Sequence, residues 1–435
     1  MLAHKLTFSP ELDEGFFAEL PTAPAVFLLR GSSGSGVLGA GGEPYVSKTA
    51  NLRRRLQRLL GVPAEKSKRL NLRDRVCEIE FTPTGSDFES QFLLYRVLRE
   101  TFPQTYAARL RLRPAPLIKL HLENDYPRAS VTTRLGRLYA PDFGETGASP
   151  VEPDQSGTGA GAHSTPSLPS LAPGERRASQ GNLYYGPFPS RAAAEKFASD
   201  VPDFFKMRRC VEDLNPDPSF PGCVYSEMNM CLAPCFKGCT DAEYQAEVAR
   251  VQRFFDTAGE SLAREFADER DRASADLAFE EAAAIHNRSE KLKPLLAQLP
   301  EIVRRVDLLD TLIVQRAAQP GSVALFRFRN LALSGPVMFN IELRGGSGSM
   351  ESRIEELIAS FPVTQIRSAV ECTEQLAILK RWYYRSTRLG EIFFADGKGA
   401  WPLRRMVRGI GRVFKGEKPQ EQRIFSATEY LTTPS

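Results

Sequence analysis

Five cysteines fall within thirty residues near the middle of the sequence, and their spacing is typical of a metal or cluster site. Cys210, Cys223, Cys231 and Cys235 follow the pattern C-x12-C-x7-C-x3-C, and Cys239 is expected to be a spare. Thiolates this close in a reducing compartment usually share a metal, because thiolate is a strong ligand for zinc and for iron–sulfur clusters. The spacing matches neither a paired CxxC zinc ribbon nor the bacterial ferredoxin run. Zinc, an iron–sulfur cluster and a small Pro-rich module with unconnected buried thiols therefore all stay open.

A second candidate for chemistry is a strongly basic segment near the N-terminus. Four arginines occur within six residues, and further basic residues follow: Arg53, Arg54, Arg55 and Arg58, then Lys66, Lys68, Arg69, Arg73 and Arg75. Such a cluster on a helix can bind phosphates in a salt-dependent, sequence-independent way. The alternative is an ordinary solvated helix face. Residues 401–418 form a weaker candidate of the same kind, a basic amphipathic segment.

The chain that carries these groups has the composition of a soluble globular protein. It has 435 residues, of which 42% are hydrophobic and 25% charged, with a net charge of +4. This length predicts two to four domains. We see neither a secretory signal nor a run of 18 apolar residues, so we expect a cytoplasmic protein with no membrane contact. An odd number of cysteines, seven in all, argues against a secreted disulfide framework.

The elements that must position the candidate groups follow from periodicity. We expect strands at 24–30, 44–48 and 75–84, a helix over the basic segment, a helix at 86–103, and a hairpin formed by 116–123 and 128–135. Residues 144–180 have almost no large apolar side chains, which predicts a disordered loop. Thr240 and Glu243 form a capping-box signature that opens about sixty helical residues. Strand-like segments resume near residue 303.

The order of these segments resembles the N-terminal half of the UvrC excinuclease family. "LPTAPAVFLLR" and "YVSKTANLRRRL" are similar to the family's GIY-YIG nuclease motifs, and "YYGPFPS" to its YFGPFP motif. "CLAPC" and the two preceding cysteines match the family's cysteine-rich module, and residues 273–292 resemble its UVR helical hairpin. The resemblance covers roughly residues 20–300. Neither the family's second nuclease domain nor its helix-hairpin-helix motifs have a counterpart that we recognise in this sequence.

The resemblance implies specific roles at the nuclease motifs. In the family a tyrosine activates water, a glutamate holds one divalent cation, and that cation and an arginine stabilise the transition state. Tyr45, Lys48 and Arg55 match retained motif positions. The metal-binding glutamate falls at Leu94, nine residues before Pro103, and a leucine cannot bind Mg²⁺ or Mn²⁺.

Other motif positions also depart from the family. The first tyrosine is Phe27, the motif glycine is Ser47, and a further tyrosine falls at Leu59. Glu89 and Glu100 match other positions of the helix, so we expect neither to replace the missing glutamate. These departures predict a degenerate nuclease domain.

The resemblance also implies partners and a cofactor. In the family the UVR hairpin docks on UvrB through an apolar face, retained here at Leu277, Phe279, Ala282, Ala283 and Ile285. The alternative is an ordinary intramolecular hairpin. The cysteine module resembles the proposed site of a 4Fe–4S cluster, which makes Cys210, Cys223, Cys231 and Cys235 its expected ligands.

Together these observations predict a multidomain α+β protein. The expected parts are a GIY-YIG-like domain, a connecting region, a cysteine-rich module, a helical region and a strand-rich C-terminal region with a basic tail, at 15–105, 106–209, 210–239, 240–300 and 301–435. The expected function is DNA binding in nucleotide excision repair, with UvrB as a partner and an impaired nuclease. Two alternatives are an active 3′-incising endonuclease and a nucleic-acid-binding regulator outside repair.

Overall fold

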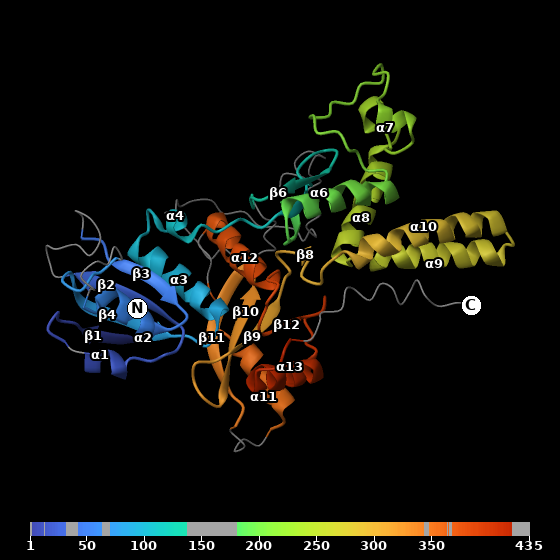
Figure 1. The fold of residues 1–435 in the computed structure, drawn as a ribbon. Coiled ribbons are helices and arrows are strands. Elements are labelled where there is room, and N and C mark those ends of the chain that lie inside the picture. Colours follow the sequence, from blue (N-terminus) through green and yellow to red (C-terminus); the bar gives the residue numbers. More distant parts are fainter. Residues whose placement is uncertain are drawn as a thin grey trace, which may run out of the picture. The chain divides into compact units, whose positions relative to one another are not determined.

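The computed structural model describes residues 2–12, 14–31, 42–62, 70–136, 181–342, 348–362, 364 and 368–419. These residues form two compact units, one drawn from Met1–Ala115 with Leu308–Gln422 and the other from Pro116–Asp307. The described strands form three four-stranded sheets in which every pairing is antiparallel. With the helices around them, they confirm the predicted multidomain α+β fold (Figure 1). The predicted loop 144–180 lies outside the described residues.

The first unit begins with a sheet of order β1-β4-β2-β3. Its elements are β1 (His4–Thr7), α1 (Glu14–Glu19), β2 (Ala25–Gly31), β3 (Tyr45–Thr49), α2 (Leu52–Leu60), β4 (Val76–Pro83), α3 (Asp87–Thr101) and α4 (Tyr106–Leu110). The predicted strands and helices of this region are thus confirmed. Asn51 caps α2 by accepting a hydrogen bond from the backbone N–H of Arg54, which fixes where the basic helix begins.

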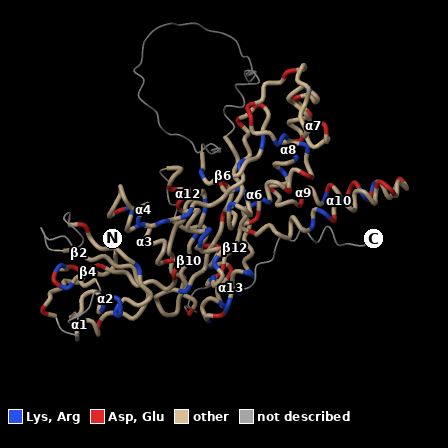
Figure 2. Tube along the Cα trace, turned by 45° about the horizontal axis from the view of Figure 1, so that its top comes forward, with Lys and Arg blue, Asp and Glu red and all other residues tan. Residues whose placement is uncertain are grey.

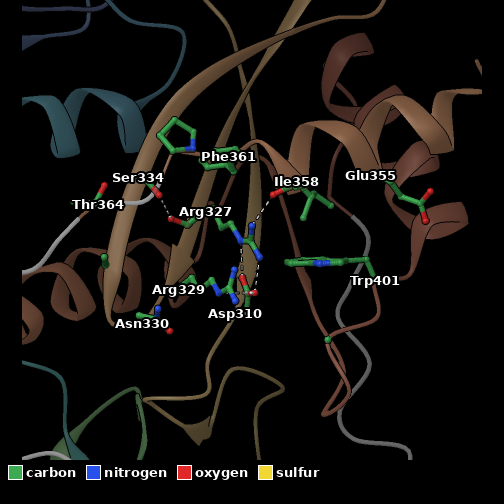
Figure 3. Close-up of a pocket in the computed structure, with 14 residues that line it drawn as sticks. Asp310, Arg327, Arg329, Asn330, Ser334, Glu355, Ile358, Phe361, Thr364 and Trp401 are labelled. Carbon is green, nitrogen blue, oxygen red and sulfur yellow. Dashed lines mark hydrogen bonds and ion pairs between the residues drawn. The ribbon is translucent and has the colours of Figure 1, made fainter. Parts of the chain in front are cut away.

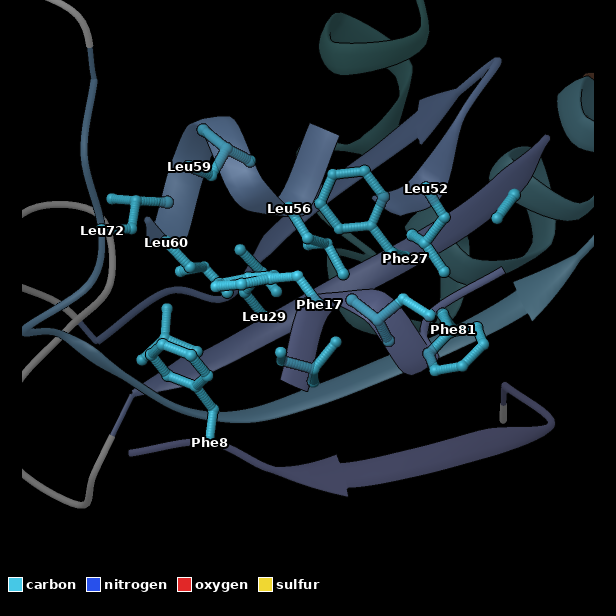
Figure 4. Packing of buried hydrophobic residues seen from close by; sticks show 14 residues of the cluster. Phe8, Phe17, Phe27, Leu29, Leu52, Leu56, Leu59, Leu60, Leu72 and Phe81 are labelled. Carbon is cyan, nitrogen blue, oxygen red and sulfur yellow. The ribbon is translucent and has the colours of Figure 1, made fainter. Parts of the chain in front are cut away.

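Strand β2 is apolar along most of its length because both of its faces are covered. Phe27 and Leu29 join a cluster with the buried leucines of α2, which is drawn in Figure 4. Val26 and Leu28 lie on the other face with Val97 of α3. Alternate residues of a strand point to opposite faces, so one short strand supports α2 on one side and α3 on the other.

The same unit continues with a second sheet of order β11-β10-β9-β12. Its elements are β9 (Thr311–Arg316), β10 (Ser322–Arg329), β11 (Ala332–Asn340), α11 (Met350–Ala359), α12 (Ala369–Tyr383), β12 (Glu391–Phe394) and α13 (Leu403–Lys415). Residues of α11 and α13 share a core with inward side chains of β9 and β10. The predicted strands are therefore joined by three helices that complete a packed α+β layer.

Helix α3 also packs on this second sheet. Phe88 lies edge-on to Phe326 of β10 and close to Trp382 of α12, with ring centroids 5.0 and 5.2 Å apart. The hydroxyl of Tyr95 donates to Glu374 Oε2 at 3.0 Å, and Arg99 forms an ion pair with Glu371. Because one helix contacts both sheets, residues far apart in sequence form one unit.

The second unit holds the third sheet, of order β6-β5-β7-β8, and the helices that follow it. Its elements are β5 (Leu117–Leu120), β6 (Ala129–Thr132), β7 (Leu183–Gly186), α6 (Arg191–Asp200), η1 (Val201–Phe204), α7 (Val224–Glu227), η2 (Pro234–Phe236), α8 (Asp241–Asp256), α9 (Glu260–Ala275), α10 (Phe279–Ala297) and β8 (Arg304–Arg305). Thr240 and Glu243 form the predicted capping box at α8. Helices α9 and α10 form a long antiparallel pair (Figure 1).

Candidate functional site

The structure joins two of the three retained motif residues and places the third elsewhere. The hydroxyl of Tyr45 on β3 accepts a hydrogen bond of 2.8 Å from Nη2 of Arg55 on α2. Lys48 instead forms an ion pair of 2.7 Å with Asp87, at the start of α3. Because Tyr45 and Lys48 are three residues apart on one strand, their side chains point to opposite faces of the sheet.

Lys48 is held in a three-residue ion-pair group. Its partner Asp87 also pairs with Arg385, which follows α12. Burial by itself would raise the pKa of the Asp87 carboxyl, but hydrogen bonds and charge from Lys48 and Arg385 lower that pKa overall. The ammonium group of Lys48 therefore links β3, α3 and the segment after α12.

The four arginines of α2 divide into two pairs. Arg53 donates from Nε to the carbonyl of Leu20 at 2.8 Å, and Arg55 is bonded to Tyr45. Arg54 and Arg58 are exposed one turn apart, and helical periodicity places them opposite the buried leucines of α2. Arg53 and Arg55, by contrast, are half-buried. Basic positions on α2 are blue in Figure 2. Lys68 and Arg69 lie outside the described residues.

Position 94, where the family motif would have a metal-binding glutamate, packs against apolar residues. Leu94 is half-buried on α3 beside the cluster of Val26, Leu28 and Val97. Glu89 is 5% exposed and accepts a hydrogen bond of 2.7 Å from the backbone N–H of Gly85. Burial raises the pKa of Glu89 despite that hydrogen bond, which lowers it. The Glu89 carboxylate thus serves as the hydrogen-bond acceptor for a backbone N–H just before α3.

The four predicted cluster ligands lie in one loop-rich module of the second unit. Cys223 precedes α7, Cys231 is buried, and Cys235 lies in η2. The backbone N–H of Ala233 donates to Cys231 Sγ at 3.3 Å. Burial, together with the charges of Cys210, Cys235 and Cys223, raises the pKa of Cys231 to about 11, although the hydrogen bond from Ala233 lowers it. The other three thiols are therefore close enough to Cys231 for their charges to affect it.

These thiols suit a metal by their chemistry, but they do not form a finished ligand set. Each cysteine of the chain is a free thiol. Within the described part of the chain, no group of three or more His, Cys, Asp or Glu residues is placed to hold a metal ion. The spacing of the cysteines in the sequence thus brings the donors into one module without bringing them to ligand distances.

The predicted UvrB-docking face is divided between solvent and the hairpin interior. Leu277 and Phe279, at the turn between α9 and α10, are 71% and 68% exposed. Ala282 is half-buried and Ala283 exposed, whereas Ile285 is buried. The accessible apolar surface is therefore at the tip of the hairpin, and Ile285 stabilises the hairpin itself.

A cavity of about 640 Å³ in the second sheet of the first unit was not predicted from the sequence. Arg327 points into it and is held by both carboxylate oxygens of Asp310, while the ring of Trp401 lies over its guanidinium (Figure 3). The signal in the sequence is a charged residue at an inward position of the apolar run "SVALFRFRN". Asp310 therefore neutralises the charge that Arg327 brings to this cavity.

One part of the chain matches a known domain family. Residues 164–254, which include the whole cysteine-rich module, match the middle domain of UvrC/Cho excinucleases. No solved structure matches the chain. None of the described helices is both long and apolar enough to span a bilayer.

Similarity to individual proteins extends beyond that domain. UvrABC system protein C of Idiomarina loihiensis is 24% identical over 280 residues, which are 64% of this chain and 37% of that protein. The Hydrogenovibrio crunogenus protein of the same name is 24% identical over 383 residues, 86% of this chain and 54% of that protein. The Alcanivorax borkumensis protein is 26% identical over 269 residues, 61% of this chain and 37% of that protein. The matches support the UvrC family, and the chain spans about a third to a half of these relatives' length.

Proposed function

We propose that this protein is a UvrC-like DNA-binding component of nucleotide excision repair with little or no incision activity. The observation that carries this proposal is Leu94, which packs against an apolar cluster where a GIY-YIG nuclease needs a carboxylate for its cation. A leucine side chain has no oxygen to offer a hard cation such as Mg²⁺. Without that ion, the developing charge on the phosphate loses its main stabilisation.

The retained part of the site suits binding. Arg54 and Arg58 present two guanidinium groups on one exposed helix face, as phosphate contacts require. Arg55 keeps its hydrogen bond to Tyr45, which fixes its guanidinium at the edge of the sheet. In this proposal the three arginines hold DNA by its backbone, and no residue supplies the missing metal ligand.

The test is incision and binding of a lesion-bearing duplex, with UvrB supplied, in Mg²⁺ or Mn²⁺. We expect no nick but salt-dependent binding. Arg54→Ala/Arg58→Ala is expected to weaken binding about tenfold and to reduce the slope of log K against log[salt] by about 2. Arg191→Ala/Lys196→Ala is the charge-matched control, because both residues are exposed on α6 and pair within that helix.

Two outcomes would contradict the proposal. A 3′ nick that disappears in Arg55→Ala would identify an active endonuclease that uses another carboxylate. DNA binding that is insensitive to the lesion and to UvrB would favour a nucleic-acid-binding regulator outside repair. Contact with UvrB is proposed at the exposed hairpin tip, where Leu277 and Phe279 offer apolar side chains.

A 4Fe–4S cluster on Cys210, Cys223, Cys231 and Cys235 is the second part of the proposal. Four neighbouring free thiols in a loop-rich module support it, since four thiolates are the usual ligands of such a cluster. The cluster would serve to cross-link the loops of the module. We expect anaerobically purified protein to contain about four iron and four sulfide ions per chain.

Variants separate the cluster from adventitious iron. Cys231→Ser is expected to lose the iron, whereas Cys372→Ser, which alters a thiol buried in α12, is expected to keep it. One zinc per chain without iron would favour the zinc alternative. A folded wild-type protein with neither metal would show that the cysteines serve only packing.

A further inference from the structure

A second basic surface lies on one face of the sheet in the second unit. In the pairing of β5 with β6, Lys119 is opposite Ser130, and the backbone N–H of His121 donates to the carbonyl of Arg128 at 2.9 Å. Paired residues in antiparallel strands share a face, as do alternate residues of one strand. Lys119, His121, Arg128 and Ser130 therefore lie together, and we name them the β5–β6 basic face.

The opposite face of this sheet is apolar and belongs to the core. Ile118, Leu120 and Tyr185 are buried there, and the ring of Tyr185 stacks on Phe255 of α8 at 4.7 Å. The four residues of the basic face are instead half-buried. The face is only partly open, because Leu117 and Tyr184, which lie on it beside Lys119, are buried.

Within the described part of the chain, the cations of this face have no acidic partners. Among the residues that the structure describes, neither Lys119 nor Arg128 forms an ion pair, and Nε of Arg128 is buried without a hydrogen-bond acceptor. Arg208, which is 3% exposed, adds a third positive charge, and its guanidinium donates to the uncharged carbonyls of Tyr126 and Glu212 and, more weakly, to Cys210 Sγ.

The electrostatic effect of this arrangement is seen at His121. Its imidazole Nε2 lies 2.7 Å from Ser130 Oγ. Burial, followed by the charges of Lys119, Arg128 and Arg208, lowers the pKa of His121 to about 4. Three cations are therefore close enough to His121 to disfavour its protonated form.

Like charges fixed close together are unfavourable unless an anion neutralises them. The groups present are an ammonium, a guanidinium, a hydroxyl and a neutral imidazole. This set of donors is typical of sites that hold phosphate oxygens.

We propose that the β5–β6 basic face binds the phosphodiester backbone of DNA, as a contact separate in sequence from the arginines of α2. The proposal rests on the proposed function, because both assume DNA as the ligand. It adds a surface in the unit that carries the cysteine module and the helical hairpin. Binding there would not depend on base sequence, since the face offers only phosphate contacts.

The test measures binding of a fluorescently labelled duplex to the full chain over a range of salt concentrations. Lys119→Ala/Arg128→Ala is expected to bind about tenfold more weakly, with a salt slope reduced by about 2. Lys119→Arg/Arg128→Lys keeps both charges and is expected to restore most of the affinity. Arg191→Ala/Lys196→Ala removes the same charge from α6 and is expected to bind like wild type.

A second measurement locates the contact and does not depend on affinity. The imidazole signal of His121, assigned with His121→Gln, is titrated with and without DNA. Neighbouring phosphates are expected to move the pKa of His121 upward, because they offset the three cations. Inorganic phosphate alone is expected to have a much weaker effect than DNA.

The outcomes distinguish this proposal from the function on which it rests. If wild-type protein does not bind DNA, the proposed function fails. If binding needs Arg54 and Arg58 but is unchanged in Lys119→Ala/Arg128→Ala, the proposed function stands and the β5–β6 basic face is not a contact. If inorganic phosphate moves the His121 signal as strongly as DNA while that double variant binds DNA normally, the face is a free-phosphate site and the proposal is wrong.

Discussion

Asp310→Ala is expected to lower the free energy of unfolding of the first unit by about 3–5 kcal/mol. Asp310 holds Arg327 through two hydrogen bonds, Nε to Oδ1 at 2.9 Å and Nη2 to Oδ2 at 2.7 Å. The two side chains are only 10% and 18% exposed, for Arg327 and Asp310 respectively. Removal of the carboxylate would leave a buried guanidinium whose remaining bond is to the carbonyl of Ile358. An uncompensated buried charge is far more costly than a lost surface ion pair.

Urea unfolding followed by tryptophan fluorescence measures this effect. The chain's two tryptophans both lie in this unit, and the ring of Trp401 lies 5.6 Å from the guanidinium carbon of Arg327. Arg329→Ala is the control, because Arg329 is 56% exposed and reaches Asp310 at 3.7 Å. We expect it to cost less than about 1 kcal/mol. Asp310→Leu/Arg327→Met should recover most of the loss, and equal effects of Asp310→Ala and Arg329→Ala would refute the argument.

Gly85→Ala is expected to destabilise the contact between α3 and the second sheet by about 3 kcal/mol. A Cβ at Gly85 would overlap the backbone of Arg316 and Ala317 at the end of β9, more closely than real Cβ atoms approach other atoms. Backbone atoms cannot rotate aside as a side chain can, so α3 must move away from the sheet. That movement would separate Phe88 from Trp382 and strain the ion pair of Asp87 with Arg385.

Tryptophan fluorescence and limited proteolysis report this change, because Trp382 packs directly on Phe88. Gly411→Ala provides the matched control: a Cβ there meets no atom within 4 Å, and Gly411 lies within α13. We expect Gly411→Ala to be neutral or to stabilise by up to about 1 kcal/mol. Unchanged unfolding and proteolysis in Gly85→Ala would mean that α3 is not held against β9 as described. DNA binding through Arg54 and Arg58 should survive both substitutions.

The position of α3 gives this helix a structural role between the two sheets of the first unit. One side, with Leu94 and Val97, covers β2 of the first sheet. The other side, with Phe88 and Tyr95, contacts β10 and α12. The apolar residue at position 94 thus contributes to packing that joins residues 1–115 to residues 308–422.

Much of the local structure is determined by the sequence alone. The apolar run of β2, the leucine periodicity of α2 and the capping box at Thr240 each depend on residues close in sequence. The helices α8, α9 and α10 follow from the same kind of pattern. Propensity, periodicity and caps are local, so these elements could be predicted with bounds that differ by only a few residues. The short edge strand β1, whose side chains are mostly exposed, carries no such signal.

Contacts between side chains that are distant in the sequence are determined by the tertiary structure alone. No local pattern tells that Lys48 pairs with Asp87, or that Ile285 is buried while Leu277 is exposed. The three cations near His121 come from separate segments of the chain. Their proximity to His121 therefore cannot be predicted from their spacing in the sequence. The four cysteines show the converse, since close spacing brought them into one module but not to metal-ligand distances. Long-range packing and strand pairing fix these relations, because they depend on which faces become buried together.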